Sequence, residues 1–249
     1  MGLAVDACTA QHIGDRKEQQ DRIGLVAHPR RKATLLAVVA DGMGGHTGGA
    51  LAAEQVVHTV CGNFERYSPS QETPHELLDG AFRESHLMIR TGRVLNEQDP
   101  HSTGVALLME PGRATWSWCG DSRLYHFRNG GLVARTRDHS YYEELIRTNK
   151  MSPEEAAKHT HRNVLVTSLG GQDEPRIETA EMTDLQVGDA FLLCSDGIWD
   201  YFGDQELGRV LTTFSARQGS EVLINTARDR ARGGGDNCSL VIVRLVASR

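Results

Sequence analysis

Short runs of apolar residues bounded by glycine, aspartate or asparagine recur along the chain, and each is typical of a β-strand. They are rich in valine, leucine, isoleucine and aromatic residues, which favour a buried, pleated surface. The predicted strands are Leu3–Ala7, Arg22–Ala27, Thr34–Ala40, Thr103–Met109, Ala114–Cys119, Arg123–Arg128, Leu132–Arg135, Ile177–Glu181, Ala190–Cys194 and Ser239–Val246.

Other stretches carry apolar residues three and four positions apart, which is the period of an amphipathic helix. In the first of them, Ala53, Val56 and Val60 share one face. Serine followed by proline at position 153 is a common helix start, because serine caps the first turn and proline fits within it. The predicted helices are Gly49–Tyr67, His75–Leu95, Tyr141–Asn149, Pro153–Lys158, Asp204–Phe214 and Gly219–Arg230.

The order of these elements favours an α+β fold. Two helices fall between the early strands, four strands then follow in succession, and helices return afterwards. That order suits layers with mostly antiparallel sheets better than a strictly alternating, doubly wound fold. Residues 140–171 have the weakest strand pattern, so we interpret them as an insertion over a sheet edge that is too small to hold its own core. One domain over residues 1–249 is therefore expected.

Composition narrows the class of protein. Of 249 residues, 39% are hydrophobic and 24% are charged, as in soluble globular domains. Lys and Arg number 27 against 33 for Asp and Glu, so the net charge of -6 favours neither a nucleic-acid partner nor a membrane contact. No apolar run has bilayer length, and the N-terminal residues lack a secretory pattern. The five dispersed cysteines predict neither a disulfide framework nor a zinc site, so we expect a cytoplasmic protein.

Five aspartates lie where predicted strands begin or end, and four of them stand directly beside glycine or asparagine. They are Asp21, Asp41, Asp121, Asp196 and Asp236. If they converge, their mutual repulsion requires bound cations. Carboxylate oxygens without nearby histidine or cysteine favour Mg²⁺ or Mn²⁺.

Each of these fragments is ambiguous when it is considered alone. An Asp-Gly pair between strands is more often a turn than a metal ligand. The stretch GMGGHTGG lacks the lysine of a nucleotide-binding loop, so it is equally well a flexible loop or a helix start. HRNVL lacks the aspartate of a kinase catalytic loop, and no other kinase motif accompanies it.

Together, the fragments are specific because of their order. Along the chain stand RKEQQD, DGMGGHTGG, HSTGVALL, GDSRLYHFRNGGL, TRDHS, HRNVLVTSLGG, LLCSDGIWD and GGGDNCSLVIV. In this order they resemble the metal-dependent type 2C Ser/Thr protein phosphatases, in particular the bacterial single-domain form, over residues 6–243. The resemblance implies a four-layer α/β/β/α sandwich with two mostly antiparallel central sheets.

The resemblance also implies two core ions, Mn²⁺ or Mg²⁺. Asp41 would bridge them, the carbonyl of Gly42 would bind the second, and Asp196 and Asp236 would hold the first. The catalytic role implied for the three aspartates is to hold a metal-activated water, which attacks the phosphorus atom in line with the leaving Ser or Thr oxygen.

Further positions match less complete parts of the family pattern. Asp21 would order metal-bound waters, Asp121 would support a third and weaker ion, and Arg16 would bind the substrate phosphate. Two residues depart from the pattern: Gln19 stands where the family usually has asparagine, and His101 where it usually has glycine. Because both lie near the ligands without being ligands, activity is expected to be retained.

The resemblance implies hydrolysis of phosphoserine and phosphothreonine on a bacterial Ser/Thr kinase or its substrates. Residues 140–171 match the family's flap, where peptide preference is thought to be set. A catalytically silent adaptor that binds phosphoproteins is the alternative, but no carboxylate of the set has been lost. The expected partners are phosphorylated proteins, and a monomer is expected.

Overall fold

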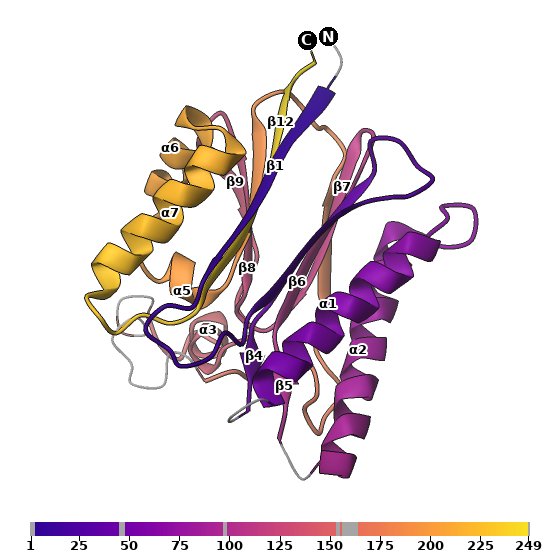
Figure 1. Ribbon diagram of the computed structural model, residues 1–249, viewed down its shortest axis with the longest axis vertical. Coiled ribbons are helices and arrows are strands. Elements are labelled where there is room, and N and C mark those ends of the chain that lie inside the picture. The colour runs from indigo at the N-terminus through magenta and orange to yellow at the C-terminus, as the bar shows by residue number, and fades with distance from the viewer. Residues whose placement is uncertain (1–2, 45–47, 97–98, 153–154, 156–163, 249) are drawn as a thin grey trace.

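Two five-stranded antiparallel sheets face each other in the centre of the computed structural model, which describes residues 3–248 apart from 45–47, 97–98, 153–154 and 156–163 (Figure 1). In spatial order the first sheet consists of β1 (Leu3–His12), β12 (Cys238–Ala247), β11 (Asp189–Cys194), β8 (Arg123–Arg128) and β9 (Gly131–Arg135). The second consists of β10 (Glu178–Met182), β7 (Arg113–Cys119), β6 (Gly104–Glu110), β3 (Leu35–Ala40) and β2 (Arg22–Ala27).

Helices cover the outer face of each sheet, so the predicted four-layer sandwich is confirmed (Figure 1). The second sheet is covered by α1 (Gly48–Arg66) and α2 (Pro74–Asn96), and the first by α5 (Asp196–Trp199), α6 (Asp204–Thr213) and α7 (Ala216–Ala231). At the end of the sheets remote from the termini lie α3 (Tyr141–Arg147) and a small pair of strands, β4 (Gly42–Met43) and β5 (His101–Ser102). Among the described residues, no helix has the length and apolarity needed to cross a bilayer.

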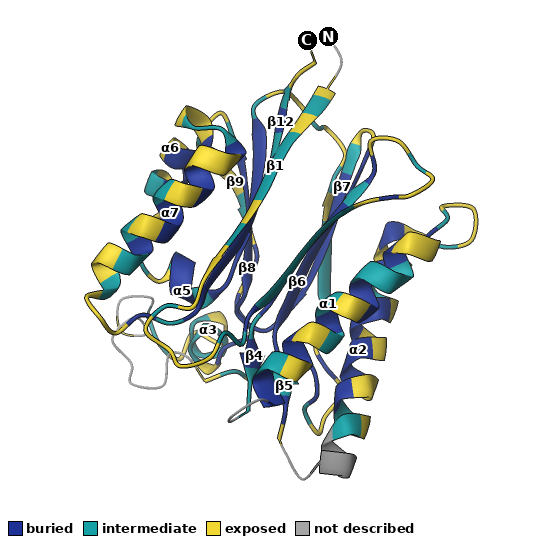
Figure 2. Ribbon diagram, viewed as in Figure 1, coloured by how far each residue is buried: buried dark blue, intermediate teal, exposed yellow. Residues whose placement is uncertain are grey.

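Three apolar layers hold the sandwich together. Alternate residues of a strand point to opposite faces of its sheet. In β3, Leu36 and Val38 therefore pack on α1 and α2, while Ala37 and Val39 pack between the sheets. The third layer lies between the first sheet and its helices. Because both faces of the central strands are buried (Figure 2), apolar residues occur on both faces of these strands rather than on alternate positions only.

The predicted strands are all present, and most of their ends agree within one residue. The exception is β1, which continues five residues beyond the prediction because its polar positions Thr9 and Gln11 still pair with β12. Sequence analysis missed β4, β5 and α5, since elements of two to four residues show no period. The predicted helix at 153–158 lies outside the described residues except for position 155.

A buried ion pair ties β8 to the loop before α3. The guanidinium of Arg123 donates two hydrogen bonds to the Asp138 carboxylate, at 2.8 and 2.6 Å, and its carbon lies 3.5 Å from the ring centroid of Trp199. The two charged side chains are only 10% and 3% exposed. Such a pair holds its elements in one arrangement, because separating the charges leaves one of them buried alone.

Replacing Asp138 with asparagine keeps the volume but leaves the Arg123 charge without its partner. We expect the free energy of unfolding to fall by about 3–5 kcal/mol in urea denaturation. The control is Arg217→Gln, which breaks the exposed pair with Glu221 on α7 and should change stability little. Equal stability of Asp138→Asn and the unaltered protein would contradict a stabilising role for the pair.

Candidate metal centre

The strand register brings the five predicted aspartates to one end of the sandwich. Asp41 directly follows β3, and Asp21 directly precedes β2. The two aspartates are adjacent because residue 22 of β2 pairs with residue 40 of β3. In the other sheet, Cys194 of β11 pairs with residue 240 of β12 and residue 123 of β8. Asp196, Asp236 and Asp121 flank these paired strand ends. All five aspartates therefore lie at the same end of the sandwich.

A cavity of about 670 Å³ opens at this end of the sandwich. Four of the five aspartates line it, namely Asp41, Asp121, Asp196 and Asp236. Gly42 and Arg16, the residue predicted to bind phosphate, also line it. The remaining aspartate, Asp21, is buried behind the cavity, where it accepts a hydrogen bond of 2.8 Å from the Ser195 hydroxyl. The structure therefore brings together all the residues that the sequence singled out.

The carboxylates at this edge destabilise one another's charges. Two causes hold the pKa of Asp41 well above its usual range: desolvation is the larger, and repulsion from neighbouring aspartates is the second. The same two causes raise the pKa of Asp121 to about 8 and that of Asp196 to about 6. A bound cation would relieve this repulsion and keep the groups ionised.

The donor set fits a hard divalent cation. One carboxylate oxygen of Asp196, Oδ1, is buried without a hydrogen-bond partner, which leaves a lone pair for a ligand. Among the described residues that line the cavity there is no histidine or cysteine. Within the described part of the chain, no three His, Cys, Asp or Glu side chains form a ligand cluster by themselves. That arrangement suits Mg²⁺ or Mn²⁺, because Mg²⁺ usually takes one or two carboxylates and keeps several waters.

Residues without a predicted role fix the backbone around Asp41. The Thr103 hydroxyl accepts a hydrogen bond of 3.0 Å from the Asp41 amide, and the Thr103 amide donates to the Asp41 carbonyl at 2.8 Å. Thr103 and the Ser122 hydroxyl are 2.7 Å apart, which joins this turn to the one that carries Asp121. Thr103 and Ser122 belong to the sequence fragments HSTG and GDSR, but only the structure shows that their hydroxyl groups contact each other and that Thr103 contacts the Asp41 backbone.

Glycine is required at position 42 because two backbones touch there. A Cβ atom at Gly42 would lie 2.0 Å from the carbonyl oxygen of Gly49. This contact places the start of α1 against the turn that carries Asp41. Residues 45–47, which complete the predicted glycine-rich motif, lie outside the described residues.

The two departures from the family pattern keep polar partners. Gln19 accepts a hydrogen bond from the Asp21 amide at 3.0 Å and donates one to the His12 carbonyl at 3.2 Å. His101 lies 3.0 Å from both Asp99 and Ser168 through its two ring nitrogens. Neither side chain is among the residues that line the cavity.

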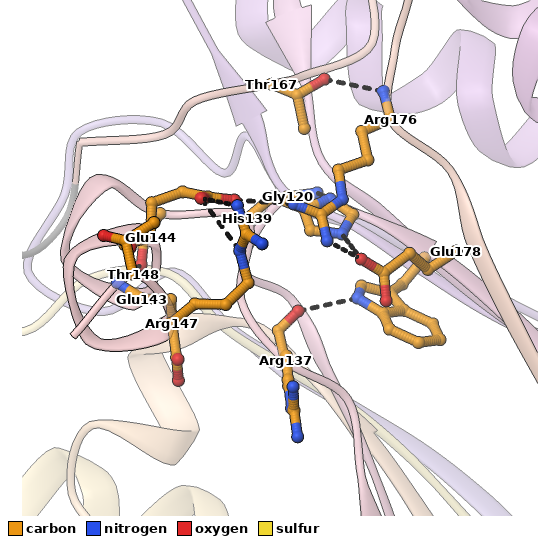
Figure 3. A network of polar contacts seen from close by, with 12 residues as sticks. Gly120, Arg137, His139, Glu143, Glu144, Arg147, Thr148, Thr167, Arg176 and Glu178 are labelled. Atoms are coloured by element: carbon orange, nitrogen blue, oxygen red, sulfur yellow. Dashed lines mark hydrogen bonds and ion pairs between the residues drawn. The ribbon is translucent and has the colours of Figure 1, made fainter. Parts of the chain in front are cut away.

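The described part of residues 140–171 is connected to the site through a polar network (Figure 3). Glu144 of α3 accepts a hydrogen bond of 2.7 Å from Arg176, which also pairs with Glu178. Glu178 lies 3.4 Å from the buried ring of His139, and that ring accepts a hydrogen bond of 3.2 Å from the Gly120 amide. The position of α3 is thereby linked to the turn between β7 and β8, at the cavity edge.

Comparison with known proteins identifies relatives along most of the chain. A family profile described as protein phosphatase 2C matches residues 8–228. The serine/threonine protein phosphatase PstP of Mycobacterium tuberculosis is 33% identical over 219 residues, which cover 86% of this chain and 41% of that protein. The serine/threonine phosphatase stp of Listeria monocytogenes is 30% identical over 215 residues, which cover 84% and 83%. The chain therefore spans about two fifths of the length of PstP.

Solved structures show the same architecture. The catalytic domain of PstP, solved in complex with two manganese ions, superposes with a TM-score of 0.82 at 27% identity. The match covers 99% of this chain and 100% of that one. The profile match, the similarity to PstP and stp and the shared fold together place this chain in the protein phosphatase 2C family.

Proposed function

We propose that this protein is a Mn²⁺- or Mg²⁺-dependent protein phosphatase that hydrolyses phosphoserine and phosphothreonine in phosphorylated proteins. The observation that carries the proposal is the set of four aspartates that line one cavity, with the Asp21 carboxylate buried behind them and a buried oxygen of Asp196 left unpartnered. The names of PstP and stp, both serine/threonine phosphatases, support it, as does the pair of manganese ions in the PstP catalytic domain.

The residues at the cavity divide among the proposed ions. Asp41 would contribute to holding both core ions, the Gly42 carbonyl would help to hold the second, and Asp196 and Asp236 would hold the first. Asp121 would support a weaker third ion together with Asp196. When bound, the ions supply positive charge to the phosphoryl oxygens and make water a better nucleophile near neutral pH.

Two other residues complete the proposed site. From behind the cavity, Asp21 orders waters through its carboxylate, which the Ser195 hydroxyl orients. Arg16 contacts Asp236 through one guanidinium nitrogen and is 61% exposed, so its remaining donors are accessible to a phosphoryl group.

Water is the proposed nucleophile, with no phosphoenzyme. Cys194, which precedes Asp196 by two residues, lies in β11 and is fully buried in the layer beneath α5. Desolvation raises the pKa of this thiol well above its usual range, so it remains protonated. A protonated core thiol is a poor nucleophile, whereas the cavity is open to solvent and to a phosphorylated side chain.

The wider setting is also part of the proposal. The two sheets share one apolar layer, which supports a single catalytic domain over residues 1–249. The substrates would be a Ser/Thr kinase or the proteins that it phosphorylates, met in the cytoplasm by a monomeric phosphatase. Residues 140–171 would act as the flap that selects among phosphopeptides.

Asp196→Asn should abolish most of the activity, because it removes charge from the first ion and from the proposed third. We expect hydrolysis of p-nitrophenyl phosphate with Mn²⁺ to fall by roughly a hundredfold or more. Circular dichroism should show a folded chain. Asp229→Asn, which neutralises an exposed aspartate of α7, is the matched control and should retain full activity.

EDTA should abolish hydrolysis by the unaltered protein, and Mn²⁺ or Mg²⁺ should restore it. Equal activity of Asp196→Asn and the control would contradict the metal assignment. A folded protein that is inactive with both ions would instead favour an adaptor, and binding to phosphorylated kinase domains would then be measured.

Shortening the segment between Thr148 and Val164 leaves the backbone bridge between Ser140 and Leu165 in place. Rates on a panel of phosphopeptides should then converge, while hydrolysis of p-nitrophenyl phosphate should change little. The reason is that a small aryl phosphate needs the ions but no peptide contact. A parallel loss on both kinds of substrate would show that the segment belongs to the catalytic scaffold.

A further inference from the structure

The segment between β1 and β2 carries Arg16 and is anchored to the C-terminal end of α7. Asp15, the preceding residue, accepts two hydrogen bonds from the Arg228 guanidinium, at 2.7 and 2.9 Å. It also accepts one from the Gly235 amide at 2.8 Å, and its own amide donates to the Gly235 carbonyl at 3.0 Å. In Figure 1 this indigo segment runs beside the yellow end of α7. Four hydrogen bonds thus converge on one residue.

The same segment touches the backbone of the candidate ligand Asp236. Gly14 has a φ of +71°, and a Cβ atom there would lie 2.0 Å from the Asp236 carbonyl oxygen. The Asn237 side chain donates hydrogen bonds to the carbonyls of Ile13 and Glu18, at 2.7 and 3.0 Å. Both ends of the segment are therefore fixed by the turn before β12, and its middle is fixed by Arg228.

An exposed ion pair by itself adds little to stability. The Asp15–Arg228 pair differs from such a pair in geometry, since the two side chains are 28% and 22% exposed and bind as a bidentate fork. Hydrogen bonds from Arg228 lower the pKa of Asp15 to about 2, so the pair stays charged at neutral pH. The residue that follows Asp15 is Arg16, whose guanidinium reaches the Asp236 carboxylate.

We propose that Arg228 and Asp15 are positioning residues that hold Arg16 at the mouth of the carboxylate cavity, where it binds the phosphate of the substrate. This inference rests on the proposed phosphatase function. Arg228 touches neither the substrate nor the ions in this arrangement. It acts through the backbone of residues 14–16, so its loss weakens phosphate binding by leaving Arg16 free to occupy other positions.

The first test compares Arg228→Gln with Arg230→Gln in the full chain with Mn²⁺. Arg230 is a matched control because it lies on the same helix and forms an equally bidentate pair with Glu206, at 2.6 and 2.8 Å, away from the cavity. With a phosphothreonine peptide, Arg228→Gln should raise KM by roughly tenfold or more and change kcat less. Arg230→Gln should leave both constants unchanged.

A double-mutant cycle separates positioning from general stability. Arg16→Met alone should raise KM, and adding Arg228→Gln to it should raise KM no further, because the group that Arg228 positions is already absent. Arg228→Lys keeps the charge without the fork, and it should give an intermediate KM. Asp15→Asn removes the pair without altering α7 and should reproduce the effect of Arg228→Gln even if the latter folds poorly.

The outcomes distinguish this inference from the function on which it rests. An unaltered protein without metal-dependent hydrolysis would overturn both. An active protein in which Arg228→Gln and Asp15→Asn both behave like Arg230→Gln would overturn the positioning role alone. Effects of Arg228→Gln that add fully to those of Arg16→Met would overturn it as well, since they would show that Arg228 acts independently of Arg16.

Discussion

Repulsion among the aspartate carboxylates at one edge of the sandwich is the constraint on which the rest of the structure depends. Like charges that share a desolvated site cannot all ionise without a cation, as the raised pKa values of Asp41 and Asp121 express. The fold must therefore hold in place groups that separate from one another when free. It does so by attaching each of them to the end of a buried or half-buried strand, where backbone movement would disturb packed side chains.

Polar contacts then determine how precisely each carboxylate is held. Thr103 fixes the backbone of Asp41, Ser195 orients Asp21, and Asn237 joins the turn before β12 to the segment that carries Arg16. None of these side chains has to touch a substrate. Together they give the cavity a fixed arrangement of oxygen atoms, and a divalent ion benefits from that arrangement because its ligands need little rearrangement on binding.

The position of Arg16 illustrates how the two halves of the chain cooperate. Its segment leaves the first strand, yet three of its anchors, Arg228, Gly235 and Asn237, come from the last sixth of the sequence. The phosphate-binding group proposed for the site is thus placed by the C-terminal helix and turn. The antiparallel pairing of β1 with β12 brings these groups together, because it places the end of β1 beside the start of β12.

Strand and helix positions and the chemical character of the site could be predicted from local periodicity and from the residue types beside each strand end. The four-layer order was implied by the resemblance to a known family rather than by periodicity. Residues such as Asp41 and Asp236 were recognisable from their glycine and asparagine neighbours and from the order of the fragments. The contacts of Thr103, the pairing of Asp15 with Arg228 and the short elements β4, β5 and α5 were not. They depend on the register of strands that are distant in sequence and on the approach of two backbones at Gly14 and Gly42. No local pattern encodes such contacts, so only the tertiary structure decided them.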